Sequence, residues 1–463
     1  MKDRLSRRDF LQASSASAGF IWAGATSPSL LSAEILDAND RINVGVIGVG
    51  GIGSHHIRLM LEHIQQENTR LVAISDVYRR RLTRTLAMSR GEAYEDGEGG
   101  LIPADSSRKG SLTDSDAYMD YRRLLERKDV DAVFICTPDH WHAKMAIDSL
   151  EAGKHVYLEK PMTLTIEQAI AVRDAVRGTQ KVLQVGPQGT SDDLYRKAQA
   201  AIREGRIGKV NFAQAGGGSN PREHIYDAWF KIDPSAGPHG SGDDYIDWDM
   251  WLGHRFGLAP KIPFNPEHVF RFRKYWPYSG GQVSDLLYHS LAPLLLAIVG
   301  PNGAYPRRAA GAGGQYVFKD DRDIPDVCVV ALDYLDDYTI LLVNNFGNAA
   351  KIPSLICGRH GTIELGDEIR LRVAGDFAEE FKEKNHGYTE VTMQREPYED
   401  SNNAEGIYNA HRMNFFNAIR GLEAPHCNAE LGAATMVGIK MAVDSYRLKK
   451  PLLWDSAREK VVG

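Results

Sequence analysis

The chain has 463 residues, of which 43% are hydrophobic and 25% are charged, and its formal net charge is −6. This composition is typical of soluble globular proteins, and the length predicts two or three domains rather than a single core. The acidic balance argues against nucleic-acid binding and against an anionic membrane surface, and no apolar run is long enough for a membrane span. We therefore expect a small, weakly charged molecule as partner, with no nucleic acid and no stable membrane span.

Cysteine and histidine spacing gives no sign of a metal site. The four cysteines are far apart in the sequence and form no C-x-x-C pair: Cys136, Cys328, Cys357 and Cys427. We interpret them as buried thiols. The histidines of "EHIYD", "GPHGSG" and "LGHRF" also lack metal-ligand spacing, so we predict no required metal.

The N-terminus resembles a twin-arginine export signal. In "SRRDFLQASSASAGFIWAGA", Arg7 and Arg8 precede Phe10 and a modestly apolar, small-residue stretch. The alternative is an ordinary basic tail. The resemblance assigns residues 1–33 to a signal and linker, with cleavage equally compatible with "GATSPS" and "LLSAE". It implies a periplasmic or otherwise exported protein that engages the twin-arginine export machinery.

A strand, a glycine turn and a helix are predicted directly after this segment, in "RINVGVIGVGGIGSHHIRLMLEHI". Gly48, Gly50 and Gly53 form G-x-G-x-x-G, which provides a tight turn, close approach of backbone to a pyrophosphate, and close helix packing. The pyrophosphate would lie at the helix N-terminus, where free N–H groups favour anions. We assign Gly51 and Ile52 of the same turn to cofactor binding as well.

An acidic residue ends the next predicted strand, "TRLVAISDVY". Asp76 stands at roughly the distance where a dinucleotide-binding domain places the carboxylate that accepts hydrogen bonds from the ribose hydroxyls. Because this carboxylate repels a 2′-phosphate, we predict NAD. NADP remains possible, because the three arginines at 79–81 follow closely, although a solvated helix face also explains them.

Short strands and helices alternate as far as residue 187, after a glycine-rich and acidic surface loop over residues 90–116. This alternation predicts an α/β fold with a doubly wound parallel sheet over residues 40–187. Ligands of such sheets bind at the carboxyl ends of the strands, where "TPDHWH" and "EKP" both lie. Residues 188–463 mix strands and helices and predict an α+β domain for the substrate, with a sheet that faces the first domain.

The tripeptide "EKP" places Lys160 on a constrained turn, because proline fixes its own φ and pushes the preceding residue toward extended geometry. Taken alone, such a lysine is most simply a solvated turn residue. At the end of a strand in a doubly wound sheet, however, its ammonium is directed toward the cofactor.

Three motifs taken in order resemble the Gfo/Idh/MocA oxidoreductases: "GVIGVGGIGSHH", "TPDHWHAKMAIDSLEAGKHVYLEKPMT" and "GGQVSDLLYHS". The resemblance covers nearly everything after residue 40. It implies a Rossmann domain plus a second domain with a large open mixed sheet, tight NAD(P) binding, and substrates among sugars, cyclitols and their derivatives. It also implies pairing of subunits through the open sheet, so we expect a homo-oligomer.

The resemblance also assigns site residues. Its catalytic lysine matches Lys160, and its later aspartate and histidine match Asp285 and His289, although "DLLYHS" stands where many relatives have "DWGAHH". It further implies cofactor contacts at Thr137, Pro138, His142, Glu159, Lys160 and Gln188.

The residue chemistry supports the catalytic assignment. Histidine titrates near neutral pH, so His289 suits the removal of a proton from a hydroxyl. Asp285 is four residues earlier and shares its helix face. Lys160 would hydrogen-bond the substrate oxygen and stabilise developing negative charge.

A later tract, "FRFRKYWPYSGG", carries the residues that we predict to bind sugar by stacking and hydrogen bonding: Arg273, Tyr275, Trp276 and Tyr278. Core packing explains some of these aromatic residues equally well.

Three functions are compatible with these patterns. The first is an exported NAD(P)-dependent oxidoreductase that acts on a secondary hydroxyl of a sugar, glycoside or cyclitol and keeps its cofactor bound through repeated cycles. The second is a redox-neutral NAD-dependent glycosidase or lyase that oxidises carbon 3 transiently. The third is a noncatalytic NAD-binding sensor, which the joint presence of Lys160, Asp285 and His289 argues against.

Overall fold

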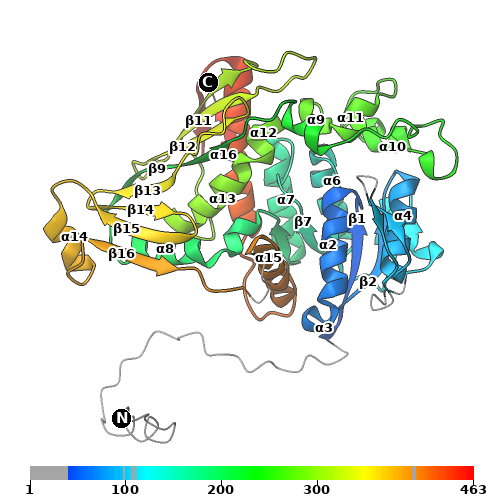
Figure 1. The fold of residues 1–463 in the computed structure, drawn as a ribbon, viewed down its shortest axis with the longest axis horizontal. Helices are drawn as coiled ribbons and strands as arrows, with labels where there is room; N and C mark the ends of the chain where they lie inside the picture. The colour runs from blue at the N-terminus through cyan, green and yellow to red at the C-terminus, as the bar shows by residue number, and fades with distance from the viewer. Residues whose placement is uncertain (1–39, 97–99, 106–109, 111, 399–402, 463) are drawn as a thin grey trace, which may run out of the picture. The chain divides into compact units, whose positions relative to one another are not determined.

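The computed structural model describes residues 40–96, 100–105, 110, 112–398 and 403–462. The segment that resembles a twin-arginine signal lies outside the described residues, so that prediction stays a prediction. The described residues form a six-stranded sheet, a ten-stranded sheet and a small two-stranded one (Figure 1). No helix among them is long and apolar enough to cross a membrane.

The six-stranded sheet is parallel throughout, with strand order β5-β2-β1-β6-β7-β8. Its strands are β1 (Ile42–Ile47), β2 (Thr69–Ser75), β5 (Ala117–Tyr118), β6 (Ala132–Ile135), β7 (His155–Leu158) and β8 (Leu183–Val185). The strand order reverses between β1 and β6, and doubly wound sheets bind their ligands at that point. The predicted α/β class and doubly wound sheet are confirmed.

Helices connect these strands in the expected alternation. They are α2 (Gly51–Glu62), α3 (Ile64–Glu67), α4 (Arg79–Arg90), α5 (Tyr121–Leu125), α6 (Asp139–Glu151) and α7 (Ile166–Thr179). The sequence sets their starts locally. For example, Thr165 and Gln168 form a capping box at the start of α7. The expected surface loop contains a short hairpin, β3 (Tyr94–Glu95) and β4 (Leu101–Ile102).

The ten-stranded sheet has the order β16-β15-β14-β13-β9-β12-β11-β10-β17-β18. Its strands are β9 (Val210–Gly218), β10 (Arg308–Gly314), β11 (Val327–Asp333), β12 (Thr339–Asn345), β13 (Ser354–Gly358), β14 (Gly361–Leu365), β15 (Glu368–Val373), β16 (Glu390–Gln394), β17 (Leu452–Asp455) and β18 (Lys460–Val462). The β9–β12 pair is parallel and the other pairs are antiparallel, which confirms the predicted large mixed sheet.

Helices cover one face of the ten-stranded sheet. They are α8 (Asp193–Arg203), α13 (Leu287–Ile298) and α16 (Ala429–Leu448), and the short helix α12 (Gly281–Asp285) packs on α13 and α16. In Figure 1, α13 and α16 run between the large sheet and α7, and α16 contacts both. One buried core therefore continues from the first sheet into the second domain. The short helix α14 (Ala378–Lys384) lies between β15 and β16 in the chain.

The helix α15 (Asn403–Ile419), from the second half of the chain, packs against the first sheet. Its Phe415 and Phe416 are fully buried beside Phe134 of β6. Residues far beyond position 187 thus complete the core of the cofactor domain.

The segment of residues 225–270 folds against the residues that follow β2. It carries α9 (Ile225–Trp229), α10 (Trp248–Leu252) and α11 (Pro266–Phe270). Its buried residues form a cluster that includes Tyr78, and Ile246 makes an isolated β-bridge to Tyr78. We call residues 233–253 the cover segment.

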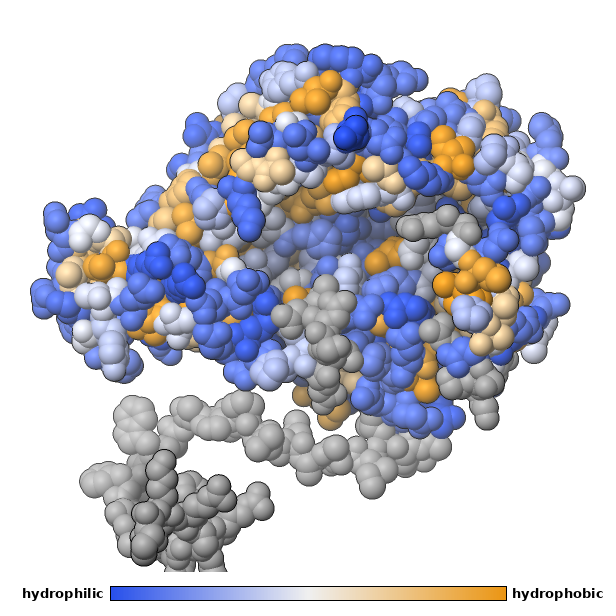
Figure 2. Space-filling view, in the orientation of Figure 1, coloured by the Kyte–Doolittle hydropathy of each residue, from blue (hydrophilic) through white to orange (hydrophobic). Residues whose placement is uncertain are grey.

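The other face of the ten-stranded sheet is apolar in the middle of the central strands β11 and β12. Val329 is exposed, and Leu341 and Val343 on the neighbouring strand are half-buried. Figure 2 shows hydrophobic residues gathered over the strands of this sheet.

Candidate functional site

The glycine turn between β1 and α2 has the geometry that a dinucleotide needs. Gly48 has φ +85°, and a Cβ there would lie 2.7 Å from the Cys136 carbonyl oxygen. A Cβ at Gly53 would lie 1.9 Å from the Gly48 carbonyl oxygen, so the start of α2 packs directly against the turn. A Cβ at Gly51 would instead meet no atom within 4 Å. The turn is therefore closely packed at Gly48 and Gly53 and has free space at Gly51, the side on which a pyrophosphate would lie.

Asp76 at the end of β2 is held beside this turn. Its Oδ2 accepts a hydrogen bond from Val49 N at 2.9 Å, and its Oδ1 accepts one from Tyr78 N at 2.9 Å. Arg81 approaches the carboxylate at 3.8 Å, whereas Arg80 pairs with Asp233 and Asp244 of the cover segment. A fixed carboxylate at the ribose position favours NAD over NADP.

The cover segment closes one side of the cofactor site. Met250 and Trp251 line a hollow together with Asp76, Thr137 and Pro138. The Trp251 carbonyl oxygen accepts a hydrogen bond from Trp141 Nε1 at 2.8 Å. Backbone hydrogen bonds from Asp247 N to Val77 O and from Arg79 N to Tyr245 O attach the segment to the cofactor domain. The second domain therefore contributes directly to the walls of the dinucleotide site.

Lys160 follows β7 and is connected to Pro161 by a cis peptide bond. Its ammonium donates to Asp285 Oδ1 at 2.7 Å and to the Asp285 carbonyl oxygen at 2.9 Å. The His142 ring lies between two backbone carbonyls, with Nδ1 2.7 Å from Pro161 O and Nε2 2.8 Å from Thr137 O. His142 thus connects the lysine turn to the loop at the end of β6.

Asp285 is the electrostatic centre of the site. Its Oδ2 accepts a hydrogen bond from the Tyr226 hydroxyl at 3.0 Å and lies 3.2 Å from Arg273 Nε. Burial alone would raise the pKa of Asp285, but the positive charges of Arg273 and Lys160 outweigh burial and hold that pKa well below its usual range. The carboxylate is therefore charged at neutral pH and fixes both cations.

His289 lies within the electrostatic range of Lys160, Asp285 and Glu159. Burial, reinforced by the Lys160 ammonium, lowers the pKa of His289 to about 3. At neutral pH the imidazole is uncharged, and it can accept a proton.

Glu159 and Gln188 lie on the side of the site nearer α2 and α15. Glu159 Oε1 lies 2.7 Å from His56 Nε2, and its Oε2 accepts a hydrogen bond from Lys160 N at 3.2 Å. Burial opposes ionisation of Glu159, but the His56 hydrogen bond and nearby positive charge lower its pKa. Gln188 interacts with Tyr408 of α15.

Three residues at this site escaped the sequence-based interpretation: Tyr226, His56 and Asp139. Asp139, at the start of α6, is buried and its Oδ2 has no hydrogen-bond partner among the described residues. Burial raises the pKa of Asp139 to about 7, despite the opposing charge of Arg273. Its place in "TPDHWH", at the carboxyl end of a predicted strand, was the only local signal.

The four residues predicted to bind sugar separate in the structure. Arg273 joins the Lys160–Asp285 pair. Tyr275 stacks on His268, with ring centroids 4.1 Å apart, and the Tyr278 hydroxyl lies 2.9 Å from His268 Nδ1. Trp276 packs near Arg447. The sequence allowed either sugar binding or core packing for the three aromatic residues, and in the structure each of them packs against other side chains.

The described residues contain no group of three or more His, Cys, Asp or Glu side chains arranged to hold a metal ion. Three of the four cysteines are buried and Cys357 is half-buried.

A comparison with protein families identifies the first domain. Residues 42–187 match the Gfo/Idh/MocA model, described as an oxidoreductase family with an NAD-binding Rossmann fold. The match covers less than half of the chain and describes residues 42–187 alone. The predicted NAD-binding Rossmann domain is thereby confirmed.

Curated relatives match over part of their length. A glycosyl hydrolase family 109 protein of Shewanella baltica strain OS195 is 32% identical over 191 residues, and one of Shewanella putrefaciens strain CN-32 is 31% identical over 191 residues. Each match spans 38% of this chain and 38% of the relative.

Solved structures share the fold over most of the chain. Levoglucosan dehydrogenase in complex with NADH and L-sorbose has a TM-score of 0.62 at 18% identity, and covers 89% of this chain and 98% of its own. The WlbA dehydrogenase from Bordetella pertussis, in complex with NADH and UDP-GlcNAcA, has a TM-score of 0.58 at 18% identity, with coverages of 90% and 99%. At this identity they show the two-domain fold alone.

Proposed function

We propose that this protein is an NAD-dependent oxidoreductase that oxidises a secondary hydroxyl of a sugar, glycoside or cyclitol. The observation that carries the proposal is the meeting of Lys160, Asp285 and Arg273 beside His289, at the carboxyl end of the NAD-binding sheet. A fixed ammonium and an uncharged imidazole are the two groups that alcohol oxidation requires from the protein.

Each residue has a distinct role in this chemistry. When bound, NAD would supply the acceptor for the hydride of the substrate carbon. His289, whose ring is uncharged at neutral pH, accepts the proton of the hydroxyl. Lys160 donates a hydrogen bond to the same oxygen and stabilises the negative charge that develops there. Asp285 positions Lys160 through the 2.7 Å contact.

Asp285 itself is positioned by Arg273 and Tyr226. Because all four groups are largely removed from water, their interactions are stronger than on the surface, and the lysine is preorganised before substrate binds. Arg273 therefore acts by orienting the pair as well as by its charge.

A second candidate is redox-neutral cleavage of a glycoside through transient oxidation at carbon 3. The name "glycosyl hydrolase family 109 protein" of the curated relatives favours it, and it uses the same first proton transfer. Mass spectrometry and NMR of the products separate the two candidates. Release of a free aglycone without net oxidation supports cleavage, whereas a keto sugar supports simple dehydrogenation.

We also propose that the protein is exported with NAD already bound and retains it during turnover. Support comes from the "SRRDFL" sequence and from the cover segment, whose Met250 and Trp251 line the dinucleotide site. Retention during long dilution requires binding on the order of 12 kcal/mol. Acid extraction of the purified protein should release close to one nicotinamide per chain. An empty protein that works only with added NAD contradicts this proposal.

The apolar outer face of the large sheet supports a homo-oligomer formed through that face. Sedimentation at several concentrations tests it, and replacing Val329 with lysine should shift the protein toward monomer. An unchanged assembly contradicts this interface.

The proposed function is tested with Lys160→Met and with Lys209→Met as a matched control. Lys160 is 13% exposed and paired with Asp285, whereas Lys209 is 67% exposed and paired with Asp337 on the surface. Loss of sugar turnover in the first variant alone supports the assignment. Equal turnover in wild type and Lys160→Met contradicts it, and a protein that binds NAD but turns over no sugar supports the noncatalytic sensor.

A further inference from the structure

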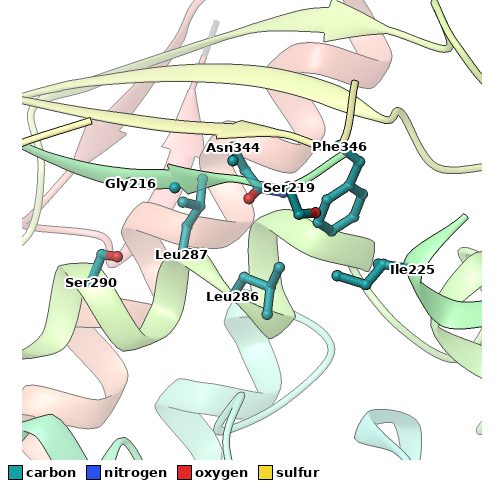
Figure 3. Close-up of a pocket in the computed structure, with 10 residues that line it drawn as sticks. Gly216, Ser219, Ile225, Leu286, Leu287, Ser290, Asn344 and Phe346 are labelled. Carbon is teal, nitrogen blue, oxygen red and sulfur yellow. The ribbon is translucent and has the colours of Figure 1, made fainter. Parts of the chain in front are cut away.

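A hollow of about 280 Å³ lies between the ten-stranded sheet and the start of α13 (Figure 3). Its lining consists of Gly216, Gly217, Gly218, Ser219, Ile225, Leu286, Leu287, Ser290, Asn344 and Phe346. None of these ten described residues carries a charge. A space of this size holds several water molecules and is large enough for one sugar ring.

Two buried polar atoms at this hollow have no hydrogen-bond partner among the described residues: Asn344 Nδ2 and Ser219 Oγ. Asn344 is only 4% exposed and stands on the face of β12 that also carries the fully buried Ile340 and Leu342. An apolar side chain would be the ordinary choice there, because a buried amide without a partner is unfavourable. The unpaired amide and hydroxyl therefore point to a ligand that supplies hydrogen bonds.

The strand β9 keeps the hollow open by lacking side chains. Gly217 pairs with Asn344 in the parallel ladder, and a Cβ at Gly217 would meet no atom within 4 Å. Its neighbours are glycine for a different reason, because a Cβ at Gly216 would lie 2.0 Å from Val343 O, and one at Gly218 would lie 2.3 Å from Asn348 O. Packing does not require glycine at position 217, so its small size is explained by the space that it leaves.

The hollow adjoins the proposed catalytic site. Leu286 follows Asp285 directly, Ser290 follows His289, and Ile225 precedes Tyr226. Leu286 joins α12 to α13, and Ser290 lies in the first turn of α13, so each lining residue is next in the chain to a residue of the catalytic pair. One elongated molecule can therefore contact both.

We propose that the hollow is a subsite for a second, uncharged sugar ring that is attached to the ring oxidised beside Lys160. This inference rests on the proposed function. Asn344 Nδ2 donates to a hydroxyl or acetamido oxygen of the second ring, and Ser219 provides a further hydrogen bond. Phe346 and Leu286 pack against the C–H face of the ring. With no cation in the lining, an anionic ring or a nucleotide phosphate has no charged partner there.

The test uses Gly217→Leu, which fills the hollow from a position where a side chain meets no atom. Gly178→Leu is the matched control, because a Cβ at this exposed helical glycine of α7 also meets nothing within 4 Å. Asn344→Leu, of similar size, removes the amide and keeps the volume. Thermal unfolding of each variant establishes that the fold is retained.

Binding and turnover are measured with methyl glycosides and with the disaccharides of glucose, galactose and N-acetylgalactosamine. A disaccharide that contains glucuronic acid serves as the charged comparison. Gly217→Leu should weaken disaccharide binding, followed by saturation-transfer NMR, by at least about tenfold, and should change methyl glycoside binding less than about twofold. Asn344→Leu should weaken disaccharide binding by about threefold to tenfold. Gly178→Leu should behave as wild type.

Equal losses for methyl glycosides and disaccharides, or no loss for either in Gly217→Leu, would overturn the subsite. Preferred binding of the glucuronic acid disaccharide would also overturn it. Because binding is followed separately from turnover, a protein that binds disaccharides through Asn344 yet turns none over refutes the proposed function and retains the subsite.

Discussion

Replacing Asp285 with asparagine should destabilise the protein and abolish its activity. The substitution keeps the shape of the side chain but removes the negative charge that Lys160 contacts at 2.7 Å and Arg273 contacts at 3.2 Å. The two cations would then face each other in a largely buried site without a counterion. Stability and catalysis should therefore fail for the same electrostatic reason.

The structure sets the expected magnitude. Removing one partner of a buried ion pair costs about 3–5 kcal/mol. Lys160 and Arg273 retain side-chain exposures of 13% and 21%, so water screens them in part and we expect the lower end, about 3 kcal/mol. Tyr226→Phe removes only a hydroxyl from Asp285 and should cost about 1 kcal/mol.

Urea unfolding followed by tryptophan fluorescence measures these differences in the free energy of unfolding. Asp337→Asn is the control, because Asp337 is 79% exposed and its ion pair with Lys209 should contribute less than about 1 kcal/mol. Adding Arg273→Met to Asp285→Asn removes one of the opposed cations, so the double variant should lose less than the sum of the single variants.

The pH dependence follows from the pKa of Asp285, which is lowered in the folded state. Its stabilisation is fully present above the unfolded pKa of about 3.9, and is lost as the pH falls toward the lowered folded pKa. The part of the difference between wild type and Asp285→Asn that comes from the Asp285 charge should thus shrink as the pH falls below about 4. A loss below about 1 kcal/mol at pH 7, or strict additivity with Arg273→Met, would refute the reasoning.

Three other predictions concern the cofactor turn and the two groups with shifted titration. Gly51→Val should fold, because a Cβ at position 51 meets no atom within 4 Å, but acid extraction should recover at least about tenfold less NAD from it than from wild type. Gly53→Ala should instead lose the native circular dichroism spectrum, because its Cβ would lie 1.9 Å from the Gly48 carbonyl oxygen. Burial raises the pKa of Asp139 to about 7, so the wild type loses stability as the pH rises from about 4 to 7. In urea unfolding, the free energy of unfolding of Asp139→Asn should equal that of wild type near pH 4. Near pH 8 it should exceed the wild-type value by up to about 4 kcal/mol. Because the pKa of His289 is lowered to about 3, the pH profile of kcat/KM should show no inflection from this group between about pH 5 and 7. His289→Ala should reduce kcat by about 10²–10⁴-fold. An inflection near pH 6.5 that disappears in His289→Ala would show that the ring is not held uncharged.

Local patterns were sufficient to predict the cofactor domain. The glycine turn, Asp76 and the strand after which Lys160 stands are each encoded within a few residues, because turn geometry and strand–helix alternation act over short distances. The register of the mixed sheet and the crossing of α15 into the first domain depend on contacts between distant segments. Phe415 and Phe416 carry no local sign that their partner is Phe134.

The candidate site likewise contains some residues that local sequence patterns predict and others that only the tertiary fold brings together. The spacing of Asp285 and His289 correctly predicted that they lie near each other, but the predicted single helix is wrong, because Asp285 ends α12 and His289 lies in the first turn of α13. Tyr226 reaches Asp285 across 59 positions and His56 reaches Glu159 across 103, and no periodicity encodes such pairs. The tract with Arg273 was noticed for its aromatic residues, yet the structure brings its arginine to Asp285 and packs the aromatic rings elsewhere. Only the tertiary fold distinguishes these roles.

Rapid mixing of the purified protein with sugars and glycosides, followed by the near-ultraviolet absorbance of reduced nicotinamide, tests the central proposal most directly. Wild type should develop this absorbance in a single turnover with at least one sugar and without added NAD, and Lys209→Met should do the same. Lys160→Met and His289→Ala should retain NAD and develop none. In protein shown to contain NAD, reduction at equal rates in all four proteins, or in none of them with any sugar tested, would contradict a sugar oxidoreductase that works through Lys160 and His289.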